Sequence, residues 1–153
     1  MEKKIAHLGF IESTIERMAN NSASIKGWSM AILAALLGIG IISGSSAGCA
    51  YRWIMYACAF VITVVMWFLD NFYIYQEKLY RKLYSLTKDT KDDDIDFSMD
   101  ARFDTIKALL LKNERSDKVF SYWRVLINRT TVPFYSAQLV AYFLFFIVPL
   151  WVK

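Results

Sequence analysis

The chain of 153 residues contains little histidine and cysteine. His7 is the only histidine, which excludes His-based metal clusters and Ser/His/Asp triads. The two cysteines, Cys49 and Cys58, lie on segments that we expect to be different, so no disulfide framework is readable. No phosphate-binding loop and no Cys-x-x-Cys pair occurs. We therefore expect no enzyme activity, no cofactor and no metal site.

Charged residues are missing from three long stretches. None lies in residues 27–51, 53–69 or 130–152. Each stretch is about as long as the roughly 17–25 residues that a helix needs to cross a hydrocarbon core. With 56% hydrophobic and 21% charged residues, the composition is also more apolar than that of an ordinary soluble domain. The sequence therefore predicts an all-α membrane protein with three transmembrane helices.

The predicted organisation has five parts: a cytoplasmic amphipathic helix in 1–22, a first span with its hairpin in 27–48, a second span in 52–75, a cytoplasmic segment in 76–132 and a third span in 133–152. We expect the second span to continue into the cytoplasm as one long helix, because helical periodicity persists through Tyr84. Short helices are expected over 101–112 and, along the membrane, over 119–127.

In the first part, apolar residues recur at helical spacing. The predicted apolar stripe consists of Ile5, Leu8, Ile15 and Met18, with Ile11 at its edge. We expect this helix either to lie on the inner leaflet or to pack against the cytoplasmic helices. Asn20-Asn21-Ser22 is predicted to end this helix, and Ser24 to cap the helix that enters the membrane.

Basic residues predict the orientation. Sixteen of the 18 Lys and Arg residues lie before the first span or between the second and third. By the positive-inside rule these parts are cytoplasmic, while the hairpin and the C-terminus face outwards from a bacterial inner membrane. Four tryptophans near the span ends are predicted interfacial anchors: Trp28, Trp53, Trp67 and Trp151. The net charge of +4 is then explained by attraction to an anionic inner leaflet, and we expect no nucleic-acid partner.

Small residues mark the first span. Ala34, Gly38, Gly40 and Gly44 are predicted to form a helix-packing surface, because small side chains let helix backbones approach closely in lipid. For Gly44 the alternative is a place in the hairpin turn. Three spans per subunit cannot enclose a pore, so any pore requires a homo-oligomer.

A charged face follows the second span. Asp70, Glu77, Arg81 and Tyr84 share one side of the predicted helix, and Glu77 precedes Arg81 in the favourable i, i+4 order. Two interpretations stay open: a solvated helix side, or a cytoplasmic interface at which Asp70 or Glu77 pairs with Arg81 of a neighbouring subunit. The 17 residues before Asp70 rise about 26 Å, which places Asp70 near the inner headgroups, where its carboxylate need not be buried.

Two further motifs have simpler explanations. Ser46-Ala47-Gly48-Cys49 is similar to a lipoprotein cleavage box, but the preceding region is long and contains glutamates, so a hairpin turn is favoured. Residues 92–100 carry acids at alternate positions, yet Phe97 and Phe103 stand where a calcium loop needs Gly and Glu, so we favour a solvated linker. No ionisable residue lies deep within a predicted span, which disfavours coupled transport.

Several short motifs are distributed along almost the whole chain: Lys26-Gly27-Trp28, Trp67-Phe68-Leu69-Asp70-x-x-Tyr73, Glu77-x-x-x-Arg81-Lys82-Leu83-Tyr84, Asp96-Phe97-Ser98-Met99 and Pro133-Phe134-Tyr135. In these the chain resembles an uncharacterised family of small bacterial multi-span inner-membrane proteins. Its architecture is similar, more remotely, to membrane-spanning effectors of antiphage defence systems. The resemblance implies no functional residue.

The resemblance favours a non-enzymatic, oligomeric inner-membrane effector that forms a pore or perturbs the membrane when a soluble cytoplasmic partner or small ligand triggers it. The alternative is a membrane scaffold or regulatory subunit that docks a soluble partner through its cytoplasmic segments.

Overall fold

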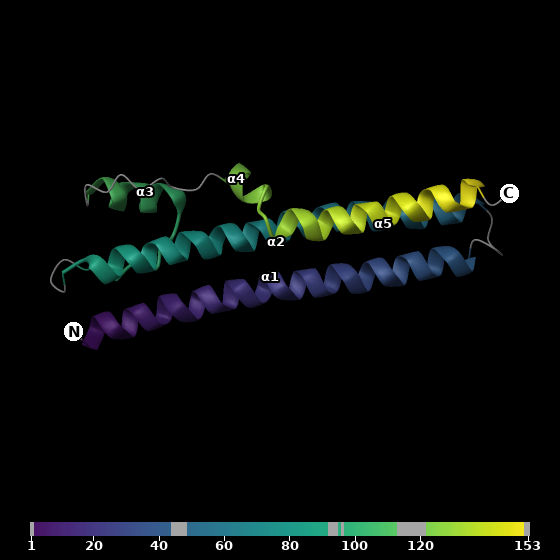
Figure 1. Ribbon diagram of the computed structural model, residues 1–153. Helices are drawn as coiled ribbons and strands as arrows, with labels where there is room; N and C mark the ends of the chain where they lie inside the picture. The colour runs from purple at the N-terminus through teal and green to yellow at the C-terminus, as the bar shows by residue number, and fades with distance from the viewer. Residues whose placement is uncertain (1, 44–48, 92–94, 96, 113–121, 152–153) are drawn as a thin grey trace. The chain divides into compact units, whose positions relative to one another are not determined.

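The computed structural model describes residues 2–43, 49–91, 95, 97–112 and 122–151. Five helices occupy most of these ranges: α1 (Glu2–Ser43), α2 (Cys49–Asp89), α3 (Phe103–Lys112), α4 (Tyr122–Leu126) and α5 (Thr131–Trp151) (Figure 1). No strand occurs in the described ranges. The all-α prediction is therefore confirmed.

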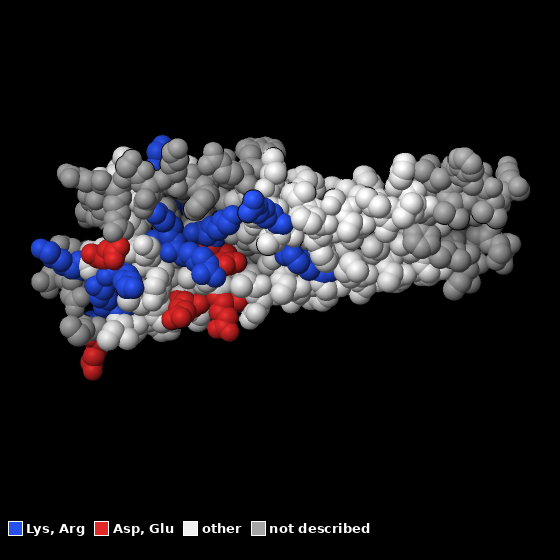
Figure 2. All heavy atoms as spheres, viewed as in Figure 1, with Lys and Arg blue, Asp and Glu red and all other residues white. Residues whose placement is uncertain are grey.

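The chain divides into two compact units with very different charge. The polar unit comprises 1–22 and 72–125, and the apolar unit comprises 23–71 and 126–153. Of the 32 charged residues, 27 belong to the polar unit and five to the apolar unit. In Figure 2 the blue and red atoms accordingly gather in one region of the surface. The helices α1 and α2 each contribute residues to both units.

Helix α1 corrects two predictions. It continues without interruption through Asn20-Asn21-Ser22, so these residues do not end it and Ser24 does not cap a new helix. Asn and Ser cost only roughly 0.5 kcal/mol each in a helix relative to Ala, which packing of the neighbouring turns offsets. Ile11 and Ile25, on either side of the predicted break, are both buried.

The buried face of α1 also differs from the predicted stripe. Ile5 is 65% exposed, whereas Ile11, placed at the edge of the stripe, is fully buried. The face includes polar residues that an apolar pattern does not select: it consists of His7, Ile11, Thr14, Ser22, Ile25, Ser29, Leu33 and Leu37. Thr14 tolerates burial because its hydroxyl donates to the Phe10 carbonyl at 3.0 Å.

The polar unit is built around one apolar core. The core joins α1, α2, α3 and the segment before α3, and consists of Ile11, Leu79, Leu83, Leu86, Ala101, Ile106 and Leu110. Two further contacts occur in the polar unit. The Tyr75 and Tyr122 rings meet edge to face, and Lys4 Nζ donates to the Thr90 carbonyl at 2.6 Å. Helix α3 confirms the short helix predicted over 101–112.

Asp100 fixes the start of α3. Its carboxylate accepts hydrogen bonds from the Arg102 guanidinium, the Arg102 amide and the Thr105 hydroxyl, at 2.7 to 3.2 Å. These contacts lower the pKa of the Asp100 carboxyl from 3.8 to about 2, with the Arg102 side chain as the main cause. Asp100 is therefore a charged cap at the first turn of this helix.

The apolar unit joins α1, α2 and α5. Leu33, Leu37, Tyr56, Ala59 and Tyr142 form its buried apolar cluster. Large hydrophobic residues also cover its outside, namely Trp28, Met30, Ile39, Tyr51, Ile54, Phe60, Val61, Val65, Phe68, Leu69, Ile127, Val132, Leu139, Val140, Phe143 and Leu144. Soluble monomeric proteins rarely expose apolar patches of this extent, which mark contact sites for proteins or membranes.

Two helices have the length and composition to cross a membrane. The qualifying stretches are Glu2–Ile39 and Trp53–Asp89. Helix α5 has 21 residues and no charged residue, and its crossing stays a prediction.

Candidate functional site

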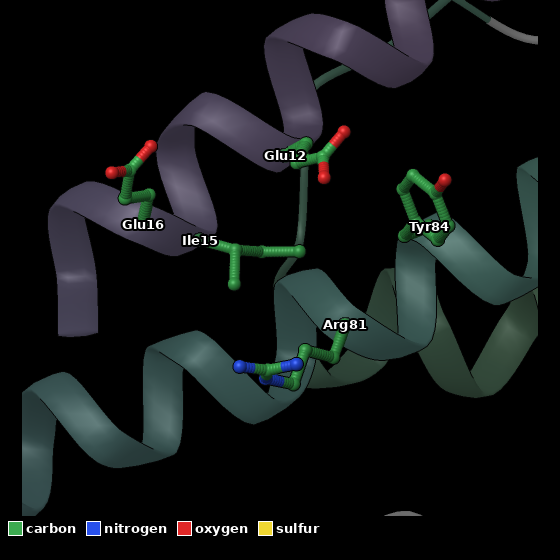
Figure 3. A pocket seen from close by; sticks show the side chains of 5 residues that line it. All are labelled: Glu12, Ile15, Glu16, Arg81 and Tyr84. Carbon is green, nitrogen blue, oxygen red and sulfur yellow. The ribbon is translucent and has the colours of Figure 1, made fainter.

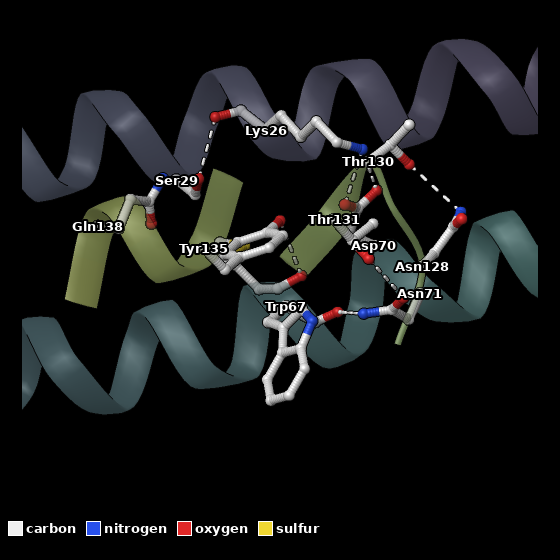
Figure 4. Close-up of polar contacts among 11 residues, drawn as sticks. Lys26, Ser29, Trp67, Asp70, Asn71, Asn128, Thr130, Thr131, Tyr135 and Gln138 are labelled. Atoms are coloured by element: carbon white, nitrogen blue, oxygen red, sulfur yellow. Dashed lines mark hydrogen bonds and ion pairs between the residues drawn. The ribbon is translucent and has the colours of Figure 1, made fainter. Parts of the chain in front are cut away.

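Polar side chains fill part of the interior of the apolar unit (Figure 4). We call this set the interhelical polar network; it consists of Lys26 and Ser29 from α1, Thr63, Asp70 and Asn71 from α2, and Thr131, Tyr135, Gln138 and Tyr142 from α5. All of these except Lys26 are buried. The unit therefore has polar contacts in its interior, beside its buried apolar cluster, and large apolar side chains on its surface.

An ion pair between α1 and α2 is the charged centre of the network. Lys26 Nζ lies 2.7 Å from Asp70 Oδ1 and 2.7 Å from Oδ2. The Asp70 side chain is fully buried, and that of Lys26 is one-quarter exposed. Removing one partner of such a pair leaves an uncompensated buried charge and costs about 3–5 kcal/mol. The pair therefore strongly favours this arrangement of α1 against α2.

This pair corrects the predicted environment of Asp70. The sequence placed its carboxylate near the headgroups with no need for burial, and offered Arg81 of a neighbouring subunit as its partner. In the structure its partner is Lys26 of the same chain. The interpretation considered the face of α2 alone, and periodicity along one helix does not show which side chain of another helix lies opposite.

Asn71 joins α2 to the first residue of α5. Its Nδ2 donates to the Trp67 carbonyl at 2.8 Å, and its Oδ1 accepts from the Thr131 hydroxyl at 3.3 Å. Asn71 and Thr131 are both fully buried. Because the amide is satisfied on both sides, the contact fixes the start of α5 against α2.

A second contact links α5 to α1. Gln138 Nε2 donates to Ser29 Oγ at 2.9 Å, and this bond holds α5 against α1. Within α1, Ser29 Oγ in turn donates to the Lys26 carbonyl at 3.0 Å. Sequence reasoning noted Ser29 and Gln138 only as polar residues within spans.

Tyr142 makes the corresponding contact between α5 and α2. Its hydroxyl donates to the Ala59 carbonyl at 2.8 Å and lies 2.7 Å from Thr63 Oγ1. Because the phenol has one proton, Thr63 is the donor in the second bond. Nearer the start of α5, the Tyr135 hydroxyl approaches the Met66 carbonyl at 3.4 Å. Interhelical hydrogen bonds of this kind contribute roughly 0.6–2 kcal/mol each within a membrane.

The other charged residues of the predicted interface lie in the polar unit. Arg81 Nε donates to Glu77 Oε1 at 2.7 Å, which confirms the i, i+4 pair. Arg81 and Tyr84 line a groove of about 460 Å³ together with Glu12, Ile15 and Glu16 of α1 (Figure 3). Asp70 does not line this groove. The four residues predicted to share one interface therefore lie in two places: Asp70 in the apolar unit, and Glu77, Arg81 and Tyr84 in the polar unit.

Two of the predicted helix-packing residues, Ala34 and Gly38, make little contact within the described part of the chain. Leu33 and Leu37 supply the contacts of α1, whereas Ala34 is exposed. A Cβ added at Gly38 would meet nothing within 4 Å. Gly40 lies in α1, and Gly44 lies outside the described residues. The small face of α1, formed by Ala34 and Gly38, is therefore open to a contact outside the chain.

The predicted anchors have different surroundings. Trp28 is 60% exposed, Trp53 packs against the apolar cluster, Trp67 is half-buried and Trp151 is the last residue of α5. Most of the residues in the proposed lipoprotein box and several acids of the calcium-like segment lie outside the described residues. Among the described residues, no group of three or more His, Cys, Asp or Glu residues is placed to hold a metal ion.

Comparisons with protein-family models, curated proteins and solved structures find no match to the chain.

Proposed function

We propose that the chain is a three-span protein of a bacterial inner membrane, with the polar unit in the cytoplasm. The apolar surface of the apolar unit supports this proposal, because the interior beneath it holds an ion pair and hydrogen-bonded hydroxyls and amides. In lipid, apolar side chains face outwards, and polar contacts between helices are retained inside. Helix α5, about 30 Å long and free of charge, completes the bundle as the third span.

We propose further that subunits associate through the small face of α1. Ala34 and Gly38 are open on the side of α1 that Leu33 and Leu37 do not use. Helices in lipid associate by close backbone approach at such small residues. A homo-oligomer assembled in this way brings together enough helices to surround a pore, which a single subunit lacks.

Our functional proposal is a non-enzymatic membrane effector that changes permeability, in the manner of effectors of antiphage defence. The continuity of α1 and α2 supports it, because each is one helix that belongs to both units. A cytoplasmic partner or ligand that displaces these helices in the polar unit therefore acts on the same helices that carry Lys26 and Asp70. The ion pair is the contact that such a displacement has to break.

The experiment is a permeability measurement in two settings. Purified protein is reconstituted in liposomes that contain a self-quenching dye, and the protein is also expressed with its neighbouring genes while membrane potential is recorded. We expect dye release or depolarisation, and faster onset for Asp70→Asn, which weakens the ion pair. An intact potential and sealed liposomes under both conditions contradict the effector proposal.

A scaffold is the second candidate, and one observation favours it. Ile5 and Phe10 of α1, in the polar unit, are 65% and 66% exposed, and Leu111 of α3 is 72% exposed. Such residues are available to a soluble partner. Ile5→Gln with Phe10→Gln should remove a specific co-purifying protein and leave permeability unchanged. Deleting residues 1–19 is a poorer test, because it removes Ile11 from the core.

A further inference from the structure

The proposed function leaves a groove between α1 and α2 in the polar unit unexplained. Its volume is about 460 Å³. Glu12, Ile15 and Glu16 line it from α1, and Arg81 and Tyr84 line it from α2. Figure 3 shows Ile15 between the two glutamates, directed towards α2. Pockets that bind small molecules begin at about 300 Å³, so the groove has room for one.

The charge of the groove is unbalanced towards acid. Glu77 neutralises Arg81 from one turn earlier on α2. Glu12 and Glu16 are exposed and form no ion pair with another described residue. Two carboxylates one helical turn apart thus remain at one wall of the groove. A ligand that complements them carries positive charge.

The remaining lining residues indicate the rest of the ligand. The Ile15 side chain is apolar and packs only partly against the core. Tyr84 lines the groove while its ring packs partly against the same core, and an aromatic ring attracts ammonium and guanidinium groups by roughly 0.5–1 kcal/mol at an exposed site. Inorganic cations do not use an aliphatic wall of this kind. The lining therefore fits a cation that has an aliphatic part.

We propose that this groove binds an organic cation, an alkylammonium or guanidinium group whose aliphatic part lies against Ile15 and Tyr84. A free polyamine and a basic side chain of a peptide share this chemistry. Glu12 and Glu16 supply the attraction, and Tyr84 discriminates cations from neutral molecules of the same shape. The site does not depend on whether the protein opens a pore.

The test uses the full chain purified in a zwitterionic detergent and titrated calorimetrically with two probes. One probe is spermidine and the other is a short peptide with blocked ends and one arginine; 1,8-octanediol serves as the uncharged comparison. We expect saturable binding of at least one cationic probe and none of the diol. Tighter binding of spermidine indicates a free amine as the source, and tighter binding of the peptide indicates a protein side chain.

Variants make the assignment specific. Glu12→Gln with Glu16→Gln should weaken binding about tenfold, because two carboxylate attractions are lost. Glu2→Gln removes an acid from the same helix outside the groove and should change the affinity less than twofold. Tyr84→Leu should weaken binding about threefold. Circular dichroism checks that the helices persist. Equal affinity of the double variant and wild type, or no saturable binding of either cation at millimolar concentration, overturns the proposal.

Discussion

Lys26 and Asp70 are 44 positions apart in the chain, yet Lys26 Nζ lies 2.7 Å from both carboxylate oxygens of Asp70. The acid is the only one in the apolar unit. Because it is fully buried, its charge depends on this one lysine more than on solvent. The pair is therefore the strongest polar constraint between α1 and α2 in that unit.

Asp70→Ala should lower the free energy of unfolding by about 1–3 kcal/mol, less than for a fully buried pair, because Lys26, which loses its partner, is one-quarter exposed. Unfolding in mixed micelles of dodecyl maltoside and SDS, followed by circular dichroism, measures this loss. Glu16→Gln removes an exposed carboxylate and serves as the control, with an expected change below about 0.5 kcal/mol. A loss from Asp70→Ala no larger than that of the control contradicts the buried ion pair.

The contact between Asn71 and Thr131 should show measurable coupling. Asn71→Leu and Thr131→Val each remove one partner of the bond between α2 and α5. In a double-mutant cycle the two changes should be non-additive by about 0.5–1.5 kcal/mol. Ser136→Ala, on the exposed side of α5, should add independently to either. Strict additivity of Asn71→Leu and Thr131→Val excludes a direct contact.

Gly38→Leu separates folding of the subunit from its assembly. A Cβ at Gly38 meets nothing within 4 Å, and replacing glycine gains roughly 0.8 kcal/mol in helix propensity, so we expect the subunit to fold, which circular dichroism checks. Light scattering after size-exclusion chromatography should show a smaller species if the small face of α1 joins subunits. Gly9 is equally open and lies in the polar unit, so Gly9→Leu should leave the size unchanged. An unaltered mass for Gly38→Leu refutes this interface.

The start of α3 should respond to acid in a defined range. Asp100 has a pKa of about 2 in the folded chain, below its ordinary 3.8, so its contribution to stability is present above pH 3.8 and is lost as the pH falls through 2. NMR shifts of the Arg102 and Thr105 resonances should therefore change with a midpoint near pH 2. In Asp100→Asn this transition should disappear. A midpoint near 4 in the wild-type chain contradicts the capping contacts.

The sequence predicted helices well where apolar periodicity and charge-free runs are long. The helical second span with its extension appears as α2, and the short helix before Lys112 appears as α3. Both helices follow from the apolar periodicity of their own residues, which needs no information about a neighbouring helix. The supposed end of α1 at Asn20-Asn21-Ser22 was wrong because weak helix formers end a helix only where no packing opposes them.

The interhelical polar network was not predicted, for a different reason. No local pattern marks Ser29, Asn71, Thr131 and Gln138. Their roles arise from hydrogen-bond partners that lie 60 to 109 residues away in the chain. Their spacing within one helix carries no information about those partners. Asp70 was named as an interface residue, but neither its burial nor its pairing with Lys26 was predicted. One available signal was Lys26, the last charged residue before a long apolar run, as Asp70 is the first after one.

The account rests on three crossings of the membrane, and the side on which the C-terminus lies tests this most directly. Alkaline phosphatase and green fluorescent protein are fused separately to the C-terminus and compared with the same reporters at the N-terminus. Three spans with the polar unit in the cytoplasm predict active phosphatase and no fluorescence at the C-terminus, with the reverse at the N-terminus. Fluorescence at both ends would show that α5 does not cross, and would contradict the account.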